Sequence, residues 1–508
     1  MILGIALAYY VILILVIGFV AKRRVKNVND FTKASSGLNW VFLTFGFTLI
    51  PLGAGHTLSL WETAPMLGAS VLWWGIVTGG IFLPIMMLWI GPWLRQTGLN
   101  TVPQVLEKIF GKKFGRLNAA INIATWTGIG AAETVATAVA IYVLSAQAIP
   151  LFPWCILIAL ILIFAYVYLA VMLQLVWLNL VNACVMIIGS YIGMFALTGW
   201  LAGNVLFQGT SGWAAVEAIF NAGGTVDVPG LAGSMIRQFD LGNAGMWFMV
   251  IIPVAVLHLS AGAVAQNMCS PFFAARSDED CRKGVFLGAF VNGMASIPWI
   301  VMALTAMVAI PALLAGNPDA NKIAPVLLAL EALPQPIVGI LCISLMAATL
   351  STGGATLLAN ANILTNDIIK GCLNPDMSDE TRMKVIKVSI LICGLLFAFP
   401  ALSNAVIFPV FLWCFSFGIP IFVVYFMGLK FSVSKSAAWI TIIVAYIVNF
   451  WWTFLPIPSV FHGTPLGLNM YPVTIVSIIL GVILPLIMPD RKPGFLVKGK
   501  MSDLATNN

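Results

Sequence analysis

The segment that decides the fold of this chain reads Phe45-Gly-Phe-Thr-Leu-Ile-Pro-Leu-Gly-Ala-Gly-His-Thr-Leu-Ser-Leu-Trp-Glu-Thr-Ala-Pro-Met-Leu-Gly68. It is apolar enough to lie in a bilayer, yet it contains four helix-breaking residues and two ionisable ones: Pro51, Gly53, Gly55 and Pro65, and His56 and Glu62. Hydrocarbon cannot satisfy the backbone groups that a helix break exposes, so such a break persists only where it lines a polar cavity. Ionisable residues at membrane depth are costly and mark functional sites. The segment therefore predicts half of a site for a solute and an ion.

The composition of the whole chain is that of a polytopic membrane protein. Of its 508 residues 61% are hydrophobic and 8% are charged, and the mean hydropathy is +1.02. Soluble domains carry roughly 25% charged residues. The eight Cys include no Cys-x-x-Cys pair, so we expect neither a zinc site nor a disulfide framework. Residues 2–20 lack a basic leading region and precede Lys22-Arg23-Arg24, which favours a retained span over a signal peptide.

A membrane helix needs roughly 20 predominantly apolar residues. We count thirteen such stretches, centred near residues 11, 54, 80, 132, 160, 188, 254, 298, 350, 395, 416, 446 and 479. The sequence therefore predicts an all-α polytopic membrane protein with about thirteen transmembrane helices. The longest loop expected outside the cell, residues 204–243, is rich in Gly and contains Trp213.

The distribution of Lys and Arg predicts the orientation, because cytoplasmic loops carry an excess of basic residues. With the N-terminus outside and the C-terminus inside, 23 of the 25 Lys and Arg fall on the cytoplasmic side, and only Arg237 and Lys322 fall outside. Topology thus explains the net charge of +7, and we expect no nucleic-acid partner.

A second interrupted span resembles the first. Span 7 carries Pro253, His258, Ser260, Gly262 and Gln266 in an otherwise apolar run. Because spans 2 and 7 are five apart, they cross the bilayer in opposite directions, and paired broken helices in two such halves are typical of a transporter binding site. We expect one transmembrane domain over residues 1–508, with inverted repeats at about 38–203 and 244–430 and peripheral helices at 2–21, 437–455 and 471–489.

Few ionisable residues lie within the spans. Glu62 directly follows the break, Glu133 lies in span 4, and Asp367 lies at the inner end of span 9. For a carboxylate such as Glu62, contact with a solute or a proton relay competes with a structural pairing role. His56 and His258 occupy the two broken spans, where they either line a cavity or pack, and a protonatable His would permit proton coupling.

Adjacent hydroxyls near the middle of span 9, Ser351 and Thr352, have two interpretations. They can hydrogen-bond back to carbonyls one turn earlier, as membrane Ser and Thr commonly do. Alternatively, together with carbonyls freed by a broken helix, they can bind a small hard cation such as sodium. Chemistry alone leaves both open.

Several blocks together resemble the sodium:solute symporter family, which includes bacterial proline, pantothenate and sugar symporters. The blocks are the loops at 97–111 and 273–283, the segment 325–334, and the motifs Met346-Ala-Ala-Thr-Leu-Ser-Thr352 and Leu364-Thr-Asn-Asp-Ile-Ile-Lys370. The resemblance covers about residues 1–490. It implies a leucine-transporter-like core built as a five-plus-five inverted repeat, alternating access, Na⁺ as coupling ion with no other cofactor, and no enzyme activity.

The resemblance also implies a site. For sodium it implies the carbonyls of Gly55, Leu58 and Ala348 and the hydroxyls of Ser351 and Thr352. For the solute it implies Glu62 and His258, to which the residue types themselves add His56 and Glu133. Two positions depart from the family pattern: Leu178 and Asn179 stand where many members have Asp, which argues against a second sodium, and Ser270-Pro271 replaces a Gln-Arg pair.

We therefore expect a multi-pass symporter of the cytoplasmic (inner) membrane that couples sodium to uptake of a small organic solute. An ionised Glu62 would favour an amine-bearing or cationic solute, with Trp61 or Trp126 for cation–π contact, and a protonated one a hydroxyl-bearing solute. The alternative is proton coupling through His56 and Glu62. A membrane sensor or an intramembrane enzyme is more remote, since the chain lacks His-Glu-x-x-His and Gly-x-Ser-x-Gly motifs.

Overall fold

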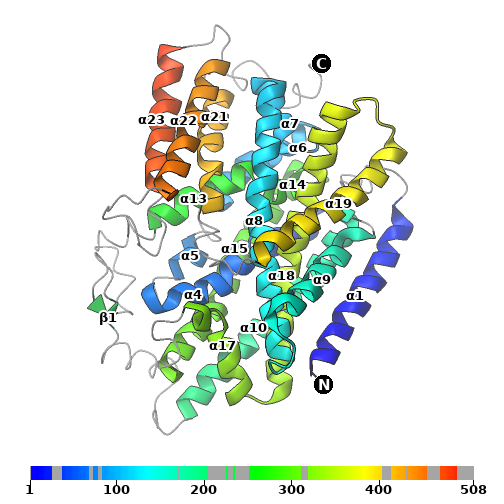
Figure 1. Cartoon of the computed structure of the whole chain (residues 1–508), viewed down its shortest axis with the longest axis vertical. Coiled ribbons are helices and arrows are strands. Elements are labelled where there is room, and N and C mark those ends of the chain that lie inside the picture. Colours follow the sequence, from blue (N-terminus) through cyan, green and yellow to red (C-terminus); the bar gives the residue numbers. More distant parts are fainter. Residues whose placement is uncertain are drawn as a thin grey trace.

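The computed structural model describes residues 2–25, 37–67, 72–77, 83–169, 171–203, 225–226, 233–234, 247, 251–310, 318–402, 413–430, 433–454 and 470–488. These residues are almost entirely helical (Figure 1). The two short strands, β1 (Thr225–Val226) and β2 (Gly233–Ser234), pair antiparallel within the long loop expected at 204–243, and the rest of that loop lies outside the described residues.

The helices that the structure describes follow one another along the chain with few interruptions. They are α1 (Ile2–Arg24), α3 (Trp40–Leu49), η2 (Ala54–His56), α4 (Leu58–Leu67), α5 (Leu72–Val77), α6 (Leu83–Gln96), α7 (Val102–Phe110), α8 (Lys112–Leu144), η5 (Leu151–Cys155), α9 (Ile156–Tyr168), α10 (Val171–Gly203), α13 (Ile252–Val264), α14 (Gln266–Phe273), α15 (Asp278–Ala309), α17 (Pro318–Ala332), α18 (Gln335–Ile363), η9 (Leu364–Leu373), α19 (Asp379–Ala401), α21 (Gly418–Lys430), α22 (Lys435–Phe454) and α23 (Met470–Ile487).

Eight helices in the described part of the chain are long and apolar enough to cross a membrane, and three shorter ones are apolar as well. Large apolar side chains are exposed on the outer helices, for example Phe19 of α1, Phe399 of α19 and Leu486 of α23, as suits surfaces that face hydrocarbon. The all-helical membrane class is thus confirmed, whereas the number thirteen and the orientation of the termini stay predictions.

Span 2 is broken where the sequence predicts it. Asn39 caps α3 by accepting the N–H groups of Val41 and Phe42, and α3 then ends at Leu49. Pro51 has no N–H with which to continue the helix, so residues 50–53 bend, η2 forms one tight turn, and α4 starts at Leu58. The interruption is confined to residues 50–57, and α4 continues through the second proline of the segment to Leu67.

Span 7 is broken nearer its end than its polar residues suggest. Helix α13 runs without interruption through His258 and ends at Val264. Ala265 then adopts an extended backbone (φ −78°, ψ 120°), and α14 begins at Gln266. The break therefore lies seven residues beyond His258, which sits inside a regular helix.

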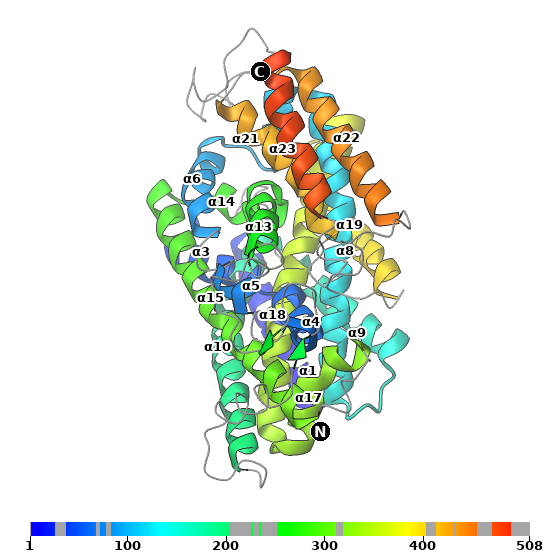
Figure 2. The ribbon, with the colours of Figure 1, turned by 90° about the vertical axis from the view of Figure 1, so that its left-hand side faces the viewer.

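The helices form two groups that meet at α18. The first helix group comprises α3 to α6 and α13 to α15, and the second comprises α8, α9, α18 and α19. Helix α10 packs against α18, α15 and α3 and so contacts both groups. Helix α18 runs through the middle of the bundle (Figure 1), and nearly all its residues from Val338 to Ile363 are buried. Helices α21 to α23 pack against one another and lie together near the top of Figure 2.

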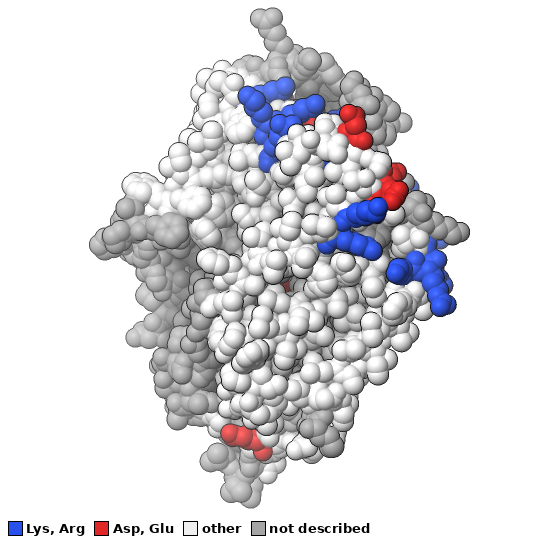
Figure 3. All heavy atoms as spheres, turned by 45° about the vertical axis from the view of Figure 1, so that its right-hand side comes forward, with Lys and Arg blue, Asp and Glu red and all other residues white. Residues whose placement is uncertain are grey.

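Basic residues gather at one end of the bundle, toward the top and right of Figure 3. This basic end is where α1 and α6 finish and where α8, α15 and α19 begin. It also joins the two broken spans, because Leu38, ahead of α3, exchanges backbone hydrogen bonds with Ala274 and Arg276. We call the other end of the bundle, where α17 lies, the opposite end. The excess of Lys and Arg predicts that the basic end is cytoplasmic.

Candidate functional site

The hydroxyls of Ser351 and Thr352 lie at the contact between α18 and the end of α3. Ser351 Oγ donates to the carbonyl of Ala348 at 2.7 Å. Thr352 Oγ1 lies 3.3 Å from the same carbonyl and 2.9 Å from that of Leu49, the last residue of α3. The local hydrogen bond and the contact with the broken span are therefore both present. Uncharged oxygens from two segments converge here, a ligand type that suits a hard cation.

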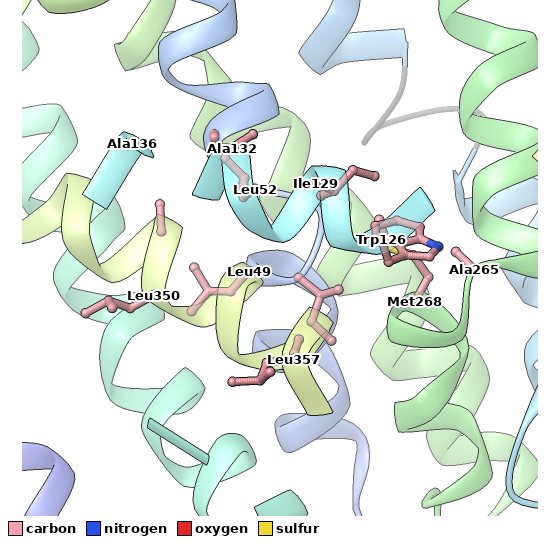
Figure 4. Packing of buried hydrophobic residues seen from close by; sticks show 14 of the residues in the cluster. Leu49, Leu52, Trp126, Ile129, Ala132, Ala136, Ala265, Met268, Leu350 and Leu357 are labelled. Carbon is pink, nitrogen blue, oxygen red and sulfur yellow. The ribbon is translucent and has the colours of Figure 1, made fainter. Parts of the chain in front are cut away.

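The carbonyl that faces α18 is that of Leu49, not one of those implied by the resemblance. Gly55 lies in η2, and Leu58 begins α4, where its carbonyl accepts a bond from the next helical turn. Among the described residues no hydrogen bond links Gly55 or Leu58 to Ser351 or Thr352. The helix ends at Leu49, so the Leu49 carbonyl accepts a turn hydrogen bond from the Leu52 N–H at 3.0 Å and also accepts the Thr352 hydroxyl. Figure 4 shows Leu49 and Leu52 between α8 and α18.

Glu133 of α8 touches the broken span directly. Its side chain is completely buried, and its Oε2 accepts the N–H of Ala54 at 2.8 Å. Gly53 lies against the carboxylate so closely that a Cβ there would overlap it. On the other side, a Cβ on Gly353 of α18 would lie 3.4 Å from Glu133 Cβ. The carboxylate predicted to contact solute thus lies at the junction of the break, α8 and α18.

The two histidines predicted to line a cavity do come together. The rings of His56 and His258 are both buried, and their centroids are 5.9 Å apart. Trp74 of α5 lies 4.8 Å from His258, and Phe415 lies 5.8 Å from it. His258 Nδ1 hydrogen-bonds to the carbonyl of Val254 at 2.8 Å, while His56 Nε2 has no hydrogen-bond partner in the part of the chain described. We call these four residues the aromatic cluster.

Sequence reasoning missed Trp74 and Phe415. Both belong to spans that carry no ionisable residue, and aromatic residues are common throughout a chain with 11% of them. Only the way the helices pack singles them out.

A narrow cavity opens beside the aromatic cluster on the side of the basic end. Its lining includes Asn122 and Trp126 of α8, Ala265 at the break of span 7, and Phe415 and Gly418. Figure 4 shows Trp126 next to Ala265 and Met268. The ring of Trp126 also packs at a tilt against that of Phe415, with centroids 5.8 Å apart, so it links the cavity to the cluster.

Glu62 has a cationic partner. Its Oε1 lies 3.8 Å from Nζ of Lys322 in α17, and both side chains are buried. Because α3 starts at the basic end and α4 leads away from it, this pair lies between the break and the opposite end. The neighbouring Trp61 donates its indole N–H to the carbonyl of Trp299 at 2.8 Å, which ties α4 to α15. Glu62 is thus placed as one half of a buried ion pair.

The position where many family members carry Asp holds a neutral network. Tyr166 donates to Asn179 Oδ1 at 3.0 Å and accepts from Asn182 at 2.8 Å. The ring of Tyr166 packs against Gly354 of α18, only two residues beyond Thr352. The network of Tyr166, Asn179 and Asn182 therefore brings no negative charge to α18.

These features define a class of protein. Two spans broken at membrane depth, hydroxyls and carbonyls facing one another across two helix groups, and a buried aromatic cluster between them are the construction of a secondary transporter. A sequence profile of the sodium:solute symporter family matches residues 31–443. The chain belongs to the sodium:solute symporter family. It is accordingly a sodium-coupled transport protein of membranes and not an enzyme.

Individual relatives agree with this family. The chain is 23% identical over 414 residues to a sodium/glucose cotransporter of Vibrio parahaemolyticus. The alignment covers 74% of this chain and 70% of that protein. Its fold is similar to that of a Na⁺-coupled sialic acid symporter in a substrate-bound outward-open state, with a TM-score of 0.78, 16% identity and coverage of 96% and 98% of the two chains. It also resembles Mhp1, a nucleobase-cation-symport-1 family transporter in a closed conformation, with a TM-score of 0.58, 13% identity and coverage of 94% and 98%.

Proposed function

We propose that this protein imports a small hydroxyl-bearing solute with Na⁺ by alternating access, across the cytoplasmic membrane and with the basic end inside. The observation that carries the proposal is the contact of Thr352 with the Leu49 carbonyl. It joins the broken span of the first helix group to α18 of the second. An ion bound there would hold the two groups in one arrangement and release them when it leaves.

The sodium site proposed from this geometry consists of the carbonyls of Leu49 and Ala348 and the hydroxyls of Ser351 and Thr352. The carbonyls of Gly55 and Leu58 stay predictions from the resemblance. One charge moved across 100 mV corresponds to about 2.3 kcal/mol, so one sodium per cycle supports appreciable accumulation of solute. Coupling requires that ion and solute each bind one arrangement more tightly than the other.

The solute site proposed is the aromatic cluster. Aromatic walls with a small number of polar groups are typical of small-molecule sites, and each neutral imidazole offers one donor and one acceptor. His56 comes from the broken span, and therefore any rearrangement of the ion site moves a wall of the solute site. This connection gives the two ligands a physical route to influence each other.

The charge at Glu62 bears on the kind of solute. A cationic solute would need an uncompensated carboxylate in its site, and Glu62 faces Lys322 instead. A neutral solute that hydrogen-bonds to His56 and His258 fits the cluster better than an amine does. The names of the relatives, a sodium/glucose cotransporter and a sialic acid symporter, point to hydroxyl-rich solutes as well.

We assign the Glu62–Lys322 pair to closure of the opposite end. It joins α4 to α17 on the far side of the aromatic cluster from the cavity. In the alternating-access cycle, the inverted repeats at about 38–203 and 244–430 would move relative to one another, and this pair would have to separate before solute enters from outside.

Uptake into proteoliposomes tests the function. A panel of sugars, sugar acids, amino acids and amines is first screened by thermal shift of the purified protein with NaCl or choline chloride. Hits are then assayed for uptake driven by an inward Na⁺ gradient. Stabilisation and uptake that require Na⁺ support symport. Uptake driven by a pH step in sodium-free medium would instead favour proton coupling, for which the facing pair His56 and His258 is the supporting observation.

A further inference from the structure

Glu133 is placed in a way that a helix cap alone does not explain. One carboxylate oxygen, Oε2, accepts the Ala54 N–H, so this oxygen has a hydrogen-bond partner. The other, Oε1, has no hydrogen-bond partner in the described part of the chain, although the side chain has no exposed surface. A buried acceptor without a partner is costly, and a buried charge without a counter-charge is more so.

Two glycines let the broken span and α18 approach the Glu133 side chain closely. Gly53 of the break and Gly353 of α18 both border the Glu133 side chain, and at Gly53 even a methyl group would overlap the carboxylate. Gly353 directly follows Thr352, and Gly53 follows Leu49 by four residues. The carboxylate therefore lies between the same two segments that supply the oxygens of the proposed sodium site.

Among the residues that the structure describes, no Lys or Arg forms an ion pair with Glu133. On the elements packed against α8, the basic groups of α7 and α19 lie toward the basic end, and Lys322 of α17 faces Glu62. At the level of the break, η2 contributes His56, α9 contributes Tyr166, and α18 contributes only neutral groups. One turn further, α8 and α18 are joined by the Thr137–Thr349 hydroxyl pair at 2.8 Å, which is already satisfied.

We propose that Glu133 is the charged ligand of the sodium site. Its Oε1 binds the ion together with the Leu49 carbonyl and the Thr352 hydroxyl, while its Oε2 keeps the Ala54 N–H in place. The inference rests on the proposed sodium coupling and adds a ligand from α8. A carboxylate makes the occupied site electrically neutral within the membrane, which neutral oxygens from α3 and α18 do not.

Direct binding of ²²Na⁺ to the purified protein in detergent tests this without relying on transport. The variant Glu133→Gln keeps an oxygen that can accept the Ala54 N–H but removes the charge, so it separates ligand from cap. We expect it to bind Na⁺ at least about 10-fold more weakly than the unmodified protein, because a buried carboxylate attracts a nearby cation strongly. Glu331→Gln, which removes an exposed carboxylate of α17, is the control and should change Na⁺ affinity less than about 3-fold.

The outcomes separate the inference from the function it rests on. If Glu133→Gln binds Na⁺ as tightly as the unmodified protein, Glu133 is a cap only and the inference is wrong. If both variants weaken Na⁺ binding equally, the effect is not specific to Glu133, and the inference is also overturned. Absence of Na⁺ binding by the unmodified protein would instead overturn the proposed function. Should Glu133→Gln fail to fold, Glu133→Asp takes its place in the test, because it keeps the charge on a shorter side chain. If the ratio of Na⁺ to Li⁺ affinity in Glu133→Asp equals that of the unmodified protein, Glu133 does not bind the ion and the inference is overturned.

Discussion

Removing one partner of the buried pair Glu62–Lys322 should destabilise the protein far more than removing both. The Nζ and Oε1 atoms are 3.8 Å apart. At an effective dielectric constant of about 20, two unit charges at this separation attract by about 4 kcal/mol. Lys322→Met would leave Glu62 as an uncompensated buried charge, and breaking a buried pair in this way costs about 3–5 kcal/mol. Replacing both partners is often nearly neutral, because the desolvation cost of each charge disappears too.

A double-mutant cycle measures the coupling. Lys322→Met, Glu62→Gln and the double variant are compared by thermal unfolding in detergent, followed by tryptophan fluorescence. We expect each single variant to melt at a lower temperature than the unmodified protein, and the double variant to recover most of the loss. The control is Glu331→Gln, which removes an exposed carboxylate from the same helix α17 and should leave the melting temperature unchanged. Additive losses in the double variant would refute the reasoning, because they would show that the two side chains do not interact.

The other predictions concern the ion site, the solute site and the break. Thr352→Ala should raise the Na⁺ concentration for half-maximal uptake about 5-fold, as expected for one lost hydroxyl contact of about 1 kcal/mol. The control Thr349→Val, one turn away, should leave that concentration unchanged. An unchanged Na⁺ dependence in Thr352→Ala would argue against the ion site. His258→Phe should weaken solute-induced thermal stabilisation while Na⁺ binding without solute stays the same, and equal solute affinity would remove His258 from the solute site. Gly53→Ala should lower stability by about 1–3 kcal/mol through overlap with Glu133; if adding Glu133→Ala to it produces purely additive losses, the overlap is not the cause.

The structure changes the interpretation of several residues that the sequence singled out correctly as unusual. The sequence predicts that Glu62 and Glu133 contact the solute, and the structure adds a partner for each, Lys322 for Glu62 and the Ala54 N–H for Glu133. Both partners lie far away in the chain, on helices whose rotation about their own axes decides which side chain faces which. Nothing in the local sequence encodes that rotation, because α8 and α18 are apolar around most of their circumference.

The register of the break is a second case. For the broken span the resemblance implies the carbonyls of Gly55 and Leu58, whereas in the structure it is the Leu49 carbonyl that contacts Thr352. The sequence alone does not show how many residues the bend and η2 take up, because the packing of the helices determines that number. In span 7 the polar residues from Pro253 to Gln266 do not fix where the helix breaks, and the structure places the break at Ala265.

The sequence by itself determined that this is a helical membrane protein, that span 2 breaks near Pro51, and that Ser351 and Thr352 fall near the middle of an apolar helix. These follow from local chemistry: hydrocarbon excludes charge, proline lacks an N–H, and membrane helices have a fixed length. Tertiary structure alone decided that Glu133 meets the break, that Glu62 meets Lys322, and that Trp74 and Phe415 surround the two histidines. Those contacts depend on how apolar helices rotate and slide against one another, and many side chains spread over the whole chain determine that packing together.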